Sequence, residues 1–73
     1  MSIKQLTNRR LINRISRAAI AREIGVSRAW ILRIEEGYDG PSFPEYKSQY
    51  EAALNKLIEE KRSPMAHEEA PDE

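Results

Sequence analysis

Apolar residues recur along most of the chain at the three- and four-residue spacing of amphipathic helices, and no stretch alternates as a strand would. The first stripe predicts a helix over residues 3–13. The apolar residues that suggest this stripe are Ile3, Leu6, Ile12 and, just beyond the helix, Ile15, with Leu11 widening the stripe.

Two short helices are predicted next, on either side of a tight turn. Ser16 and Ser27 are each placed to cap a helix, because a serine hydroxyl accepts a hydrogen bond from the first turn, and a glycine ends each helix. Since three residues separate the two helices, they form a helix–turn–helix unit. The predicted ranges are 17–24 and 28–36, ended by Gly25 and Gly37, with Ile20, Ala21 and Ile24 buried in the first.

A longer amphipathic helix is predicted over about residues 43–61, with Pro44 near its start, where proline is tolerated. Its apolar positions exceed what one buried face of so short a chain requires. They are Phe43, Tyr46, Tyr50, Ala53, Leu54, Leu57 and Ile58. Residues 63–73 begin with Ser-Pro, are acidic and are expected to form a disordered tail.

These elements predict an all-α fold: one small domain over residues 1–62, with four or five helices, the last of them long. A chain of 73 residues leaves little room for an internal pocket, so neither a cofactor nor a small-molecule ligand is expected. No apolar run approaches the roughly 20 residues that span a bilayer. With no cysteine and no signal peptide, a cytoplasmic location is expected.

The formal net charge is zero, but the charges are unevenly distributed. Residues 1–37 hold eight basic and three acidic residues, whereas residues 38–73 hold four basic and nine acidic ones. Seven of the eight basic residues in the first part are arginine, which makes bidentate contacts with phosphate and guanine. A polyanion is one partner that fits this part, and an ordinary solvated surface is the alternative.

The helix predicted over residues 28–36 has an unusual outer face. At about 100° per residue, one side holds Ser27, Trp30, Ile31 and Ile34, and the other holds Arg28, Ala29, Leu32 and Arg33. The first side is expected in the core, with Trp30 against the long helix. On the second side two arginines flank two apolar side chains, a pattern that suits guanine edges and thymine methyl groups in the major groove. A protein chain packed on Leu32 is the alternative.

The segment from Ser16 to Glu35, followed by Glu36-Gly37 and Pro41-Ser42, resembles the helix-turn-helix of XRE/Cro-type bacterial and phage repressors. The resemblance covers about half of the chain. In it, Ala21 is the small residue at which the two helices approach, and Gly25 is the glycine of the turn. The residues between Gly37 and Leu54 also faintly resemble small anti-CRISPR-associated repressors.

The resemblance implies a transcriptional repressor that binds an inverted-repeat operator as a homodimer and often regulates its own operon. Its partners would be double-stranded DNA, bound in the major groove, and a second copy of the chain. The base-reading residues would be Arg28, Ala29, Leu32 and Arg33. The candidate phosphate contacts are Ser16, Arg17, Ser27, Tyr38 and Ser42, the last two from the loop after the recognition helix.

The chain departs from the family pattern after Gly37, where two further short helices are usual and one long helix is predicted here. The dimer contacts of the family are therefore not carried over. The surplus apolar face of the long helix is instead the predicted dimer interface, formed by Tyr46, Tyr50, Leu54, Leu57 and Ile58.

The residue inventory argues against an enzyme. His67 is the only histidine and lies in the acidic tail, and without cysteine the common metal-ligand sets are missing. The adjacent glutamates at 35–36 and 59–60 diverge on a helix instead of facing each other. The alternative function is a protein-interaction module, such as an antitoxin or adaptor whose long helix binds a partner protein.

Overall fold

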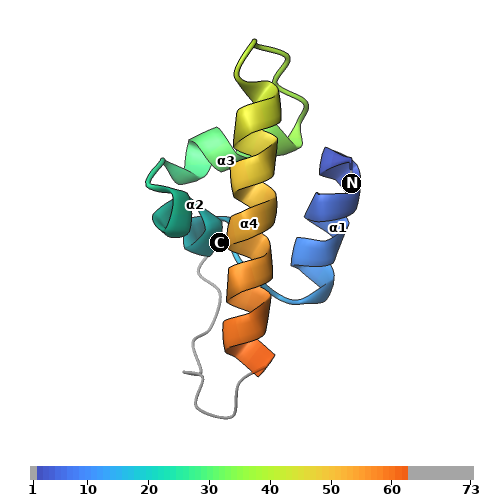
Figure 1. Ribbon diagram of the computed structural model, residues 1–73, viewed down its shortest axis with the longest axis vertical. Coiled ribbons are helices and arrows are strands. Elements are labelled where there is room, and N and C mark those ends of the chain that lie inside the picture. The colour runs from blue at the N-terminus through green and yellow to red at the C-terminus, as the bar shows by residue number, and fades with distance from the viewer. Residues whose placement is uncertain (1, 63–73) are drawn as a thin grey trace.

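The computed structural model describes residues 2–62, and the predicted tail at 63–73 lies outside the described residues. Within that range every regular element is a helix, which confirms the predicted all-α class. The helices are α1 (Ile3–Ile12), α2 (Arg17–Ile24), α3 (Arg28–Glu35) and α4 (Phe43–Arg62). In Figure 1, α4 runs the length of the molecule between α1 on one side and α2 and α3 on the other.

Serines start the first three helices, as predicted for Ser16 and Ser27 and newly seen at Ser2. The hydroxyls of Ser2, Ser16 and Ser27 each accept a hydrogen bond from the backbone N–H three residues later. The turn between α2 and α3 depends on Gly25, whose φ of 90° is left-handed. This conformation brings the N–H groups of Gly25 and Val26 onto the carbonyl oxygen of Ala21.

The core draws on all four helices. Six residues have an exposed fraction of 0%: Leu6, Ile20, Ile31, Ile34, Tyr50 and Leu54. Ala21, Ala53, Ile58 and Ile15 complete it, and Ile15 reaches the core from the loop between α1 and α2. Ala21 is thus buried in the core, as predicted.

The predicted stripe of α1 is wrong at two positions. Leu11 is 53% exposed and Ile12 is 79% exposed. The buried side of this helix is defined by Leu6 and Arg10, which stand one turn apart. Because Ile12 lies about 200° around the helix from Arg10, it points to the opposite side. Arg10 therefore lies on the buried side of α1, where the apolar pattern had placed Ile12.

The dimer interface predicted on the apolar face of α4 is corrected, because a single copy of the chain already buries most of this face. Tyr50 and Leu54 are fully buried and Ile58 is 6% exposed, while Tyr46 and Leu57 pack partly buried against the same core. A single α4 must cover α1, α2 and α3 at once, so the apolar face that exceeds one helix contact is used inside the chain. None of the described helices is both long and apolar enough to cross a membrane.

Candidate nucleic-acid interface

The outer face of α3 carries the four residues predicted to contact bases. Arg28, Ala29, Leu32 and Arg33 are all exposed, with Leu32 at 39%. On the opposite side Ile31 and Ile34 are fully buried, so the predicted division of this helix is confirmed. Ser27 is the exception, because it is exposed at the start of the helix and not part of the core.

The two serine caps differ in what they offer a phosphate. Ser27 is exposed, and its hydroxyl accepts the Trp30 N–H at 3.1 Å. Ser16 is only 4% exposed, and its hydroxyl accepts the Ala19 N–H at 3.0 Å. The predicted phosphate contact of the Ser16 side chain is therefore corrected: this hydroxyl stabilises the start of α2 from inside the domain.

Arg17, the predicted phosphate contact at the start of α2, is held by a carboxylate. Its Nε lies 2.9 Å from Oε1 of Glu35, and its side chain is 31% exposed. The ion pair fixes the guanidinium at the N-terminal end of α2, which is the end away from the turn to α3. Arg17 is thus a partly exposed cation with a fixed position, not a mobile surface side chain.

The carboxylate of Glu35 is the polar centre of the domain, and sequence reasoning missed it. Its side chain is 4% exposed, and Oε2 accepts from Nε of Arg10 at 2.8 Å and from the hydroxyl of Tyr50 at 2.5 Å. Together with Arg17, these donors come from α1, α2 and α4, while Glu35 itself ends α3. One carboxylate therefore links all four helices.

Arg10 is almost completely buried, with an exposed fraction of 1%, and Nη1 donates to the carbonyl oxygen of Ile15 at 2.8 Å. A buried guanidinium needs both a counter-charge and hydrogen-bond acceptors, which Glu35 and this carbonyl supply. The available sequence signal was the position of Arg10 one turn after Leu6, on the buried side of α1. The count of basic residues in the first half of the chain thus overstates its exposed charge.

The phenol of Tyr50 keeps its proton. Burial raises the pKa of Tyr50 well above its ordinary value of 10.0, and the hydrogen bond to the Glu35 carboxylate raises it further. Because the phenol stays neutral, it acts as a donor to Glu35 over the whole physiological pH range.

An aromatic cluster fastens the loop after α3. The ring of Trp30 meets those of Tyr38 and Tyr46 edge-on, with centroids 4.9 and 5.2 Å apart, and the second contact confirms that Trp30 packs on α4. A Cβ at Gly40 would lie 2.0 Å from the Tyr38 hydroxyl, so the ring covers this glycine. Tyr38 and Ser42 are both half-buried, so each keeps part of its surface open to the predicted phosphate contact.

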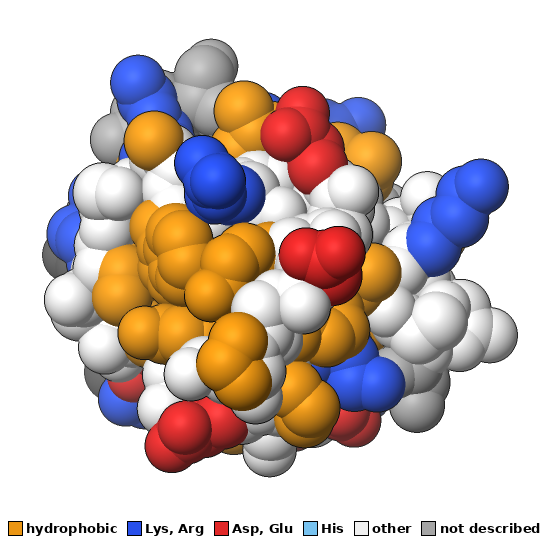
Figure 2. Space-filling view, turned by 90° about the horizontal axis from the view of Figure 1, so that it is seen from above, with side chains coloured by type: hydrophobic (Ala, Val, Ile, Leu, Met, Phe, Trp, Pro, Cys, Tyr) orange, Lys and Arg blue, Asp and Glu red, His pale blue; other side chains and the backbone are white. Residues whose placement is uncertain are grey.

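The end of the molecule that carries this loop and the start of α4 is shown in Figure 2. Hydrophobic side chains gather there, and the charged groups among them have both signs. A polyanion needs one sign of charge, so this end is a poorer surface for it than the outer face of α3.

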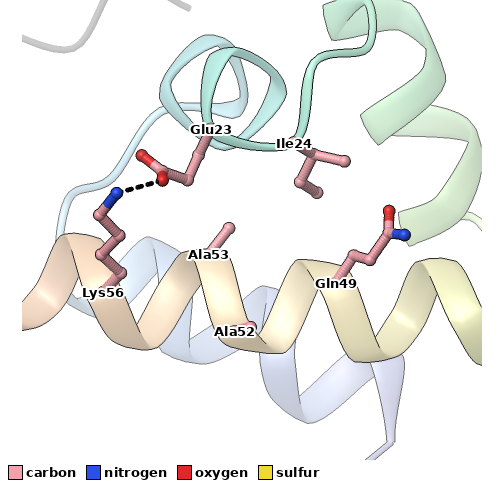
Figure 3. A pocket seen from close by; sticks show the side chains of 6 residues that line it. All are labelled: Glu23, Ile24, Gln49, Ala52, Ala53 and Lys56. Atoms are coloured by element: carbon pink, nitrogen blue, oxygen red, sulfur yellow. Dashed lines mark hydrogen bonds and ion pairs between the residues drawn. The ribbon is translucent and has the colours of Figure 1, made fainter.

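A groove of about 320 Å³ lies between α2 and α4 (Figure 3). Its lining consists of Glu23, Ile24, Gln49, Ala52, Ala53 and Lys56. Lys56 lies 2.6 Å from Glu23, and this carboxylate raises the pKa of Lys56. The charged groups at the groove therefore neutralise each other and leave no net charge for an ionic ligand. Across residues 2–62, no group of three His, Cys, Asp or Glu side chains could hold a metal ion.

Compared with known proteins, the chain matches no protein-family model, no curated protein and no solved structure. The function must therefore be inferred from the geometry of the chain itself.

Proposed function

We propose that this protein binds double-stranded DNA sequence-specifically, with the outer face of α3 in the major groove, and represses transcription. The observation that carries the proposal is the composition of that face. Two exposed arginines stand beside exposed Ala29 and Leu32, on a helix whose opposite side is locked into the core by Ile31 and Ile34. Arginine and small apolar side chains are the partners of guanine and thymine in the major groove.

The dimensions and the support of α3 agree with this function. An α-helix with its side chains is about 10–12 Å in diameter, which fits the roughly 12 Å width of the major groove, and the eight residues of α3 present about 12 Å of helix length to it. The helix is anchored at its start by the Ser27 cap and at its end by Glu35, whose carboxylate is bonded to α1, α2 and α4. A base-reading helix needs such rigid support, because small displacements break its hydrogen bonds to base edges.

The phosphate contacts in this proposal come from the elements around α3. Arg17 lies at the N-terminal end of α2, where the helix dipole also favours an anion, and Ser27 is exposed at the start of α3. Ser27 lies in the turn that joins the two helices, whereas Arg17 lies at the other end of α2. They would fix the orientation of α3 in the groove without reading sequence.

The proposed repressor acts in the cytoplasm as a homodimer that binds an inverted-repeat operator. The promoter of its own operon is the first candidate for that operator. Two copies would place their α3 helices about 34 Å apart, one turn of DNA. The contact between copies would use a surface other than the apolar face of α4, which one copy buries.

Footprinting of the DNA upstream of its own gene, near physiological salt, tests this function. The expected result is a two-fold symmetric protected region that is absent from a scrambled duplex of the same composition. Equal binding to the two duplexes would contradict sequence-specific recognition.

A protein-interaction module remains a second candidate because Leu11 and Ile12, adjacent in sequence, are the most exposed large apolar side chains of the described residues. The surface would then be the end of α1 and not the long helix. In this case replacing both residues by serine abolishes binding to the partner, whereas Arg33→Ala changes nothing.

A further inference from the structure

The exposed face of α3 has an ordered layout of apolar and cationic groups. With Ile31 and Ile34 fixing the buried direction, the opposite direction falls between Ala29 and Leu32 at about 100° per residue. Arg28 and Arg33 lie about 140° apart around the helix, one on each side of this apolar centre. They also differ in height, since five residues correspond to about 7.5 Å along the axis.

Over the first two turns of α3 the centre of the face is therefore apolar, with 39% of Leu32 exposed and no hydrogen-bonding side chain between it and Ala29. A guanine or cytosine edge placed against this centre would lose its hydrogen bonds to water without replacement. The methyl group of thymine is the apolar feature of the major groove and avoids much of this loss.

We infer that α3 selects a half-site with thymine methyl groups at its centre and a guanine on each side, the two guanines on opposite strands. This inference rests on the proposed function and adds the base composition that the same face prefers. The guanines face Arg28 and Arg33, whose positions on opposite edges of the helix direct them to opposite strands. The thymine methyl groups contact Ala29 and Leu32.

A second feature confines this contact to the first two turns of α3. Glu36 follows the helix directly and is exposed. At about 100° per residue it lies on the same side as Ala29 and Leu32, one turn further on. Its carboxylate repels the phosphates of the DNA backbone there, so the stretch of base pairs that α3 contacts is short.

Selection of bound duplexes from a random pool, followed by single replacements of thymine by uracil in the selected duplex, tests the inference. Uracil removes only the 5-methyl group and keeps base pairing. At the central positions it is expected to weaken binding about threefold to fivefold per methyl contact, from roughly 0.8 kcal/mol per buried carbon. At the outer positions it is expected to have no effect.

Protein variants assign the effect to one side chain. Leu32→Ala is expected to shrink the difference between thymine and uracil at the central position that Leu32 contacts and to leave it at the position that Ala29 contacts. Leu11→Ala, a matched change at an exposed leucine of α1, is expected to keep both differences. Uracil tolerated at every position, or a selected centre of G·C pairs, would overturn the inference while leaving sequence-specific binding intact. A pool from which no sequence is enriched would instead contradict the proposed function.

Discussion

The hydroxyl of Tyr50 donates a 2.5 Å hydrogen bond to the carboxylate of Glu35, in the interior of the domain. Tyr50 lies in the middle of α4, and Glu35 is the last residue of α3. The bond therefore fastens the helix that carries the proposed base contacts to the longest helix of the fold. Because Glu35 also pairs with Arg10 and Arg17, a substitution of Glu35 is expected to change both the free energy of unfolding and the placement of α3.

Tyr50→Phe removes this donor and keeps the ring in the core. Since hydrogen bonds to charged groups contribute about 1.5–3 kcal/mol, the free energy of unfolding is expected to fall by about that amount. Urea denaturation followed by circular dichroism measures it. Tyr46→Phe is the matched control, because its ring contact with Trp30 survives, and a loss of equal size in both variants would contradict the account.

Alkaline pH is expected to destabilise the protein through the same residue. The pKa of Tyr50 is raised in the folded state, whereas in the unfolded chain it returns to about 10. Above this pH the unfolded state releases a proton that the folded state retains, so the stabilisation present below pH 10 is progressively lost. Tyr50→Phe lacks this contribution, and the difference in unfolding free energy between it and the wild type is expected to shrink as the pH rises.

The absorbance of tyrosinate offers an independent check on that pH dependence. The chain has three tyrosines. One of them is expected to ionise only as the protein unfolds, and this late step is expected to vanish in Tyr50→Phe. Ionisation of all three before unfolding would show that Tyr50 is not held as a neutral donor.

Glu35→Gln is expected to be the most damaging conservative change in the domain. It leaves the guanidinium of Arg10, 1% exposed, without its counter-charge, and breaking a buried pair in this way costs about 3–5 kcal/mol. Thermal melting is the measurement. The double variant Arg10→Met with Glu35→Gln removes the buried charge as well, so it is expected to melt at a higher temperature than Glu35→Gln alone. The opposite order would contradict a buried ion pair.

The cap at the start of α3 is expected to contribute measurably to stability. Ser27→Ala removes the acceptor of the Trp30 N–H and should cost about 1 kcal/mol, while Ser27→Asp restores an acceptor and most of the stability. Ser48→Ala, at an exposed position inside α4, serves as the control and is expected to be neutral or slightly stabilising. Equal effects at the two serines would argue against the cap.

Local signals in the sequence were sufficient to predict the helices. The serine caps, the glycines at 25 and 37, and the apolar spacing place all four helices to within one residue of their observed ends. These signals act within one or two turns of the chain, which is why they are visible without tertiary structure. The exposed face of α3 was predictable for the same reason, because its buried side is marked by Ile31 and Ile34.

What the sequence did not reveal depends on contacts between distant residues. Arg10 and Glu35 are 25 positions apart, and nothing local indicates that one neutralises the other inside the core. The apolar face of α4 was correctly located, but the surface that covers it was not, because the other helices of the same chain pack on it where a second copy was expected. An amphipathic pattern shows that a face is buried and does not show whether the same chain or a second copy covers it.

The most direct test of the central claim is DNA binding by Arg28→Ala and Arg33→Ala, compared with Arg62→Ala at the end of α4 away from the α3–α4 loop (Figure 1). All three variants lose one positive charge, so a purely electrostatic attraction weakens similarly in each. If α3 reads bases, each of the first two changes costs about 1–3 kcal/mol on the selected duplex and relaxes its sequence preference, while Arg62→Ala keeps that preference. A preference that neither α3 arginine affects would contradict the account and leave α3 as a structural support.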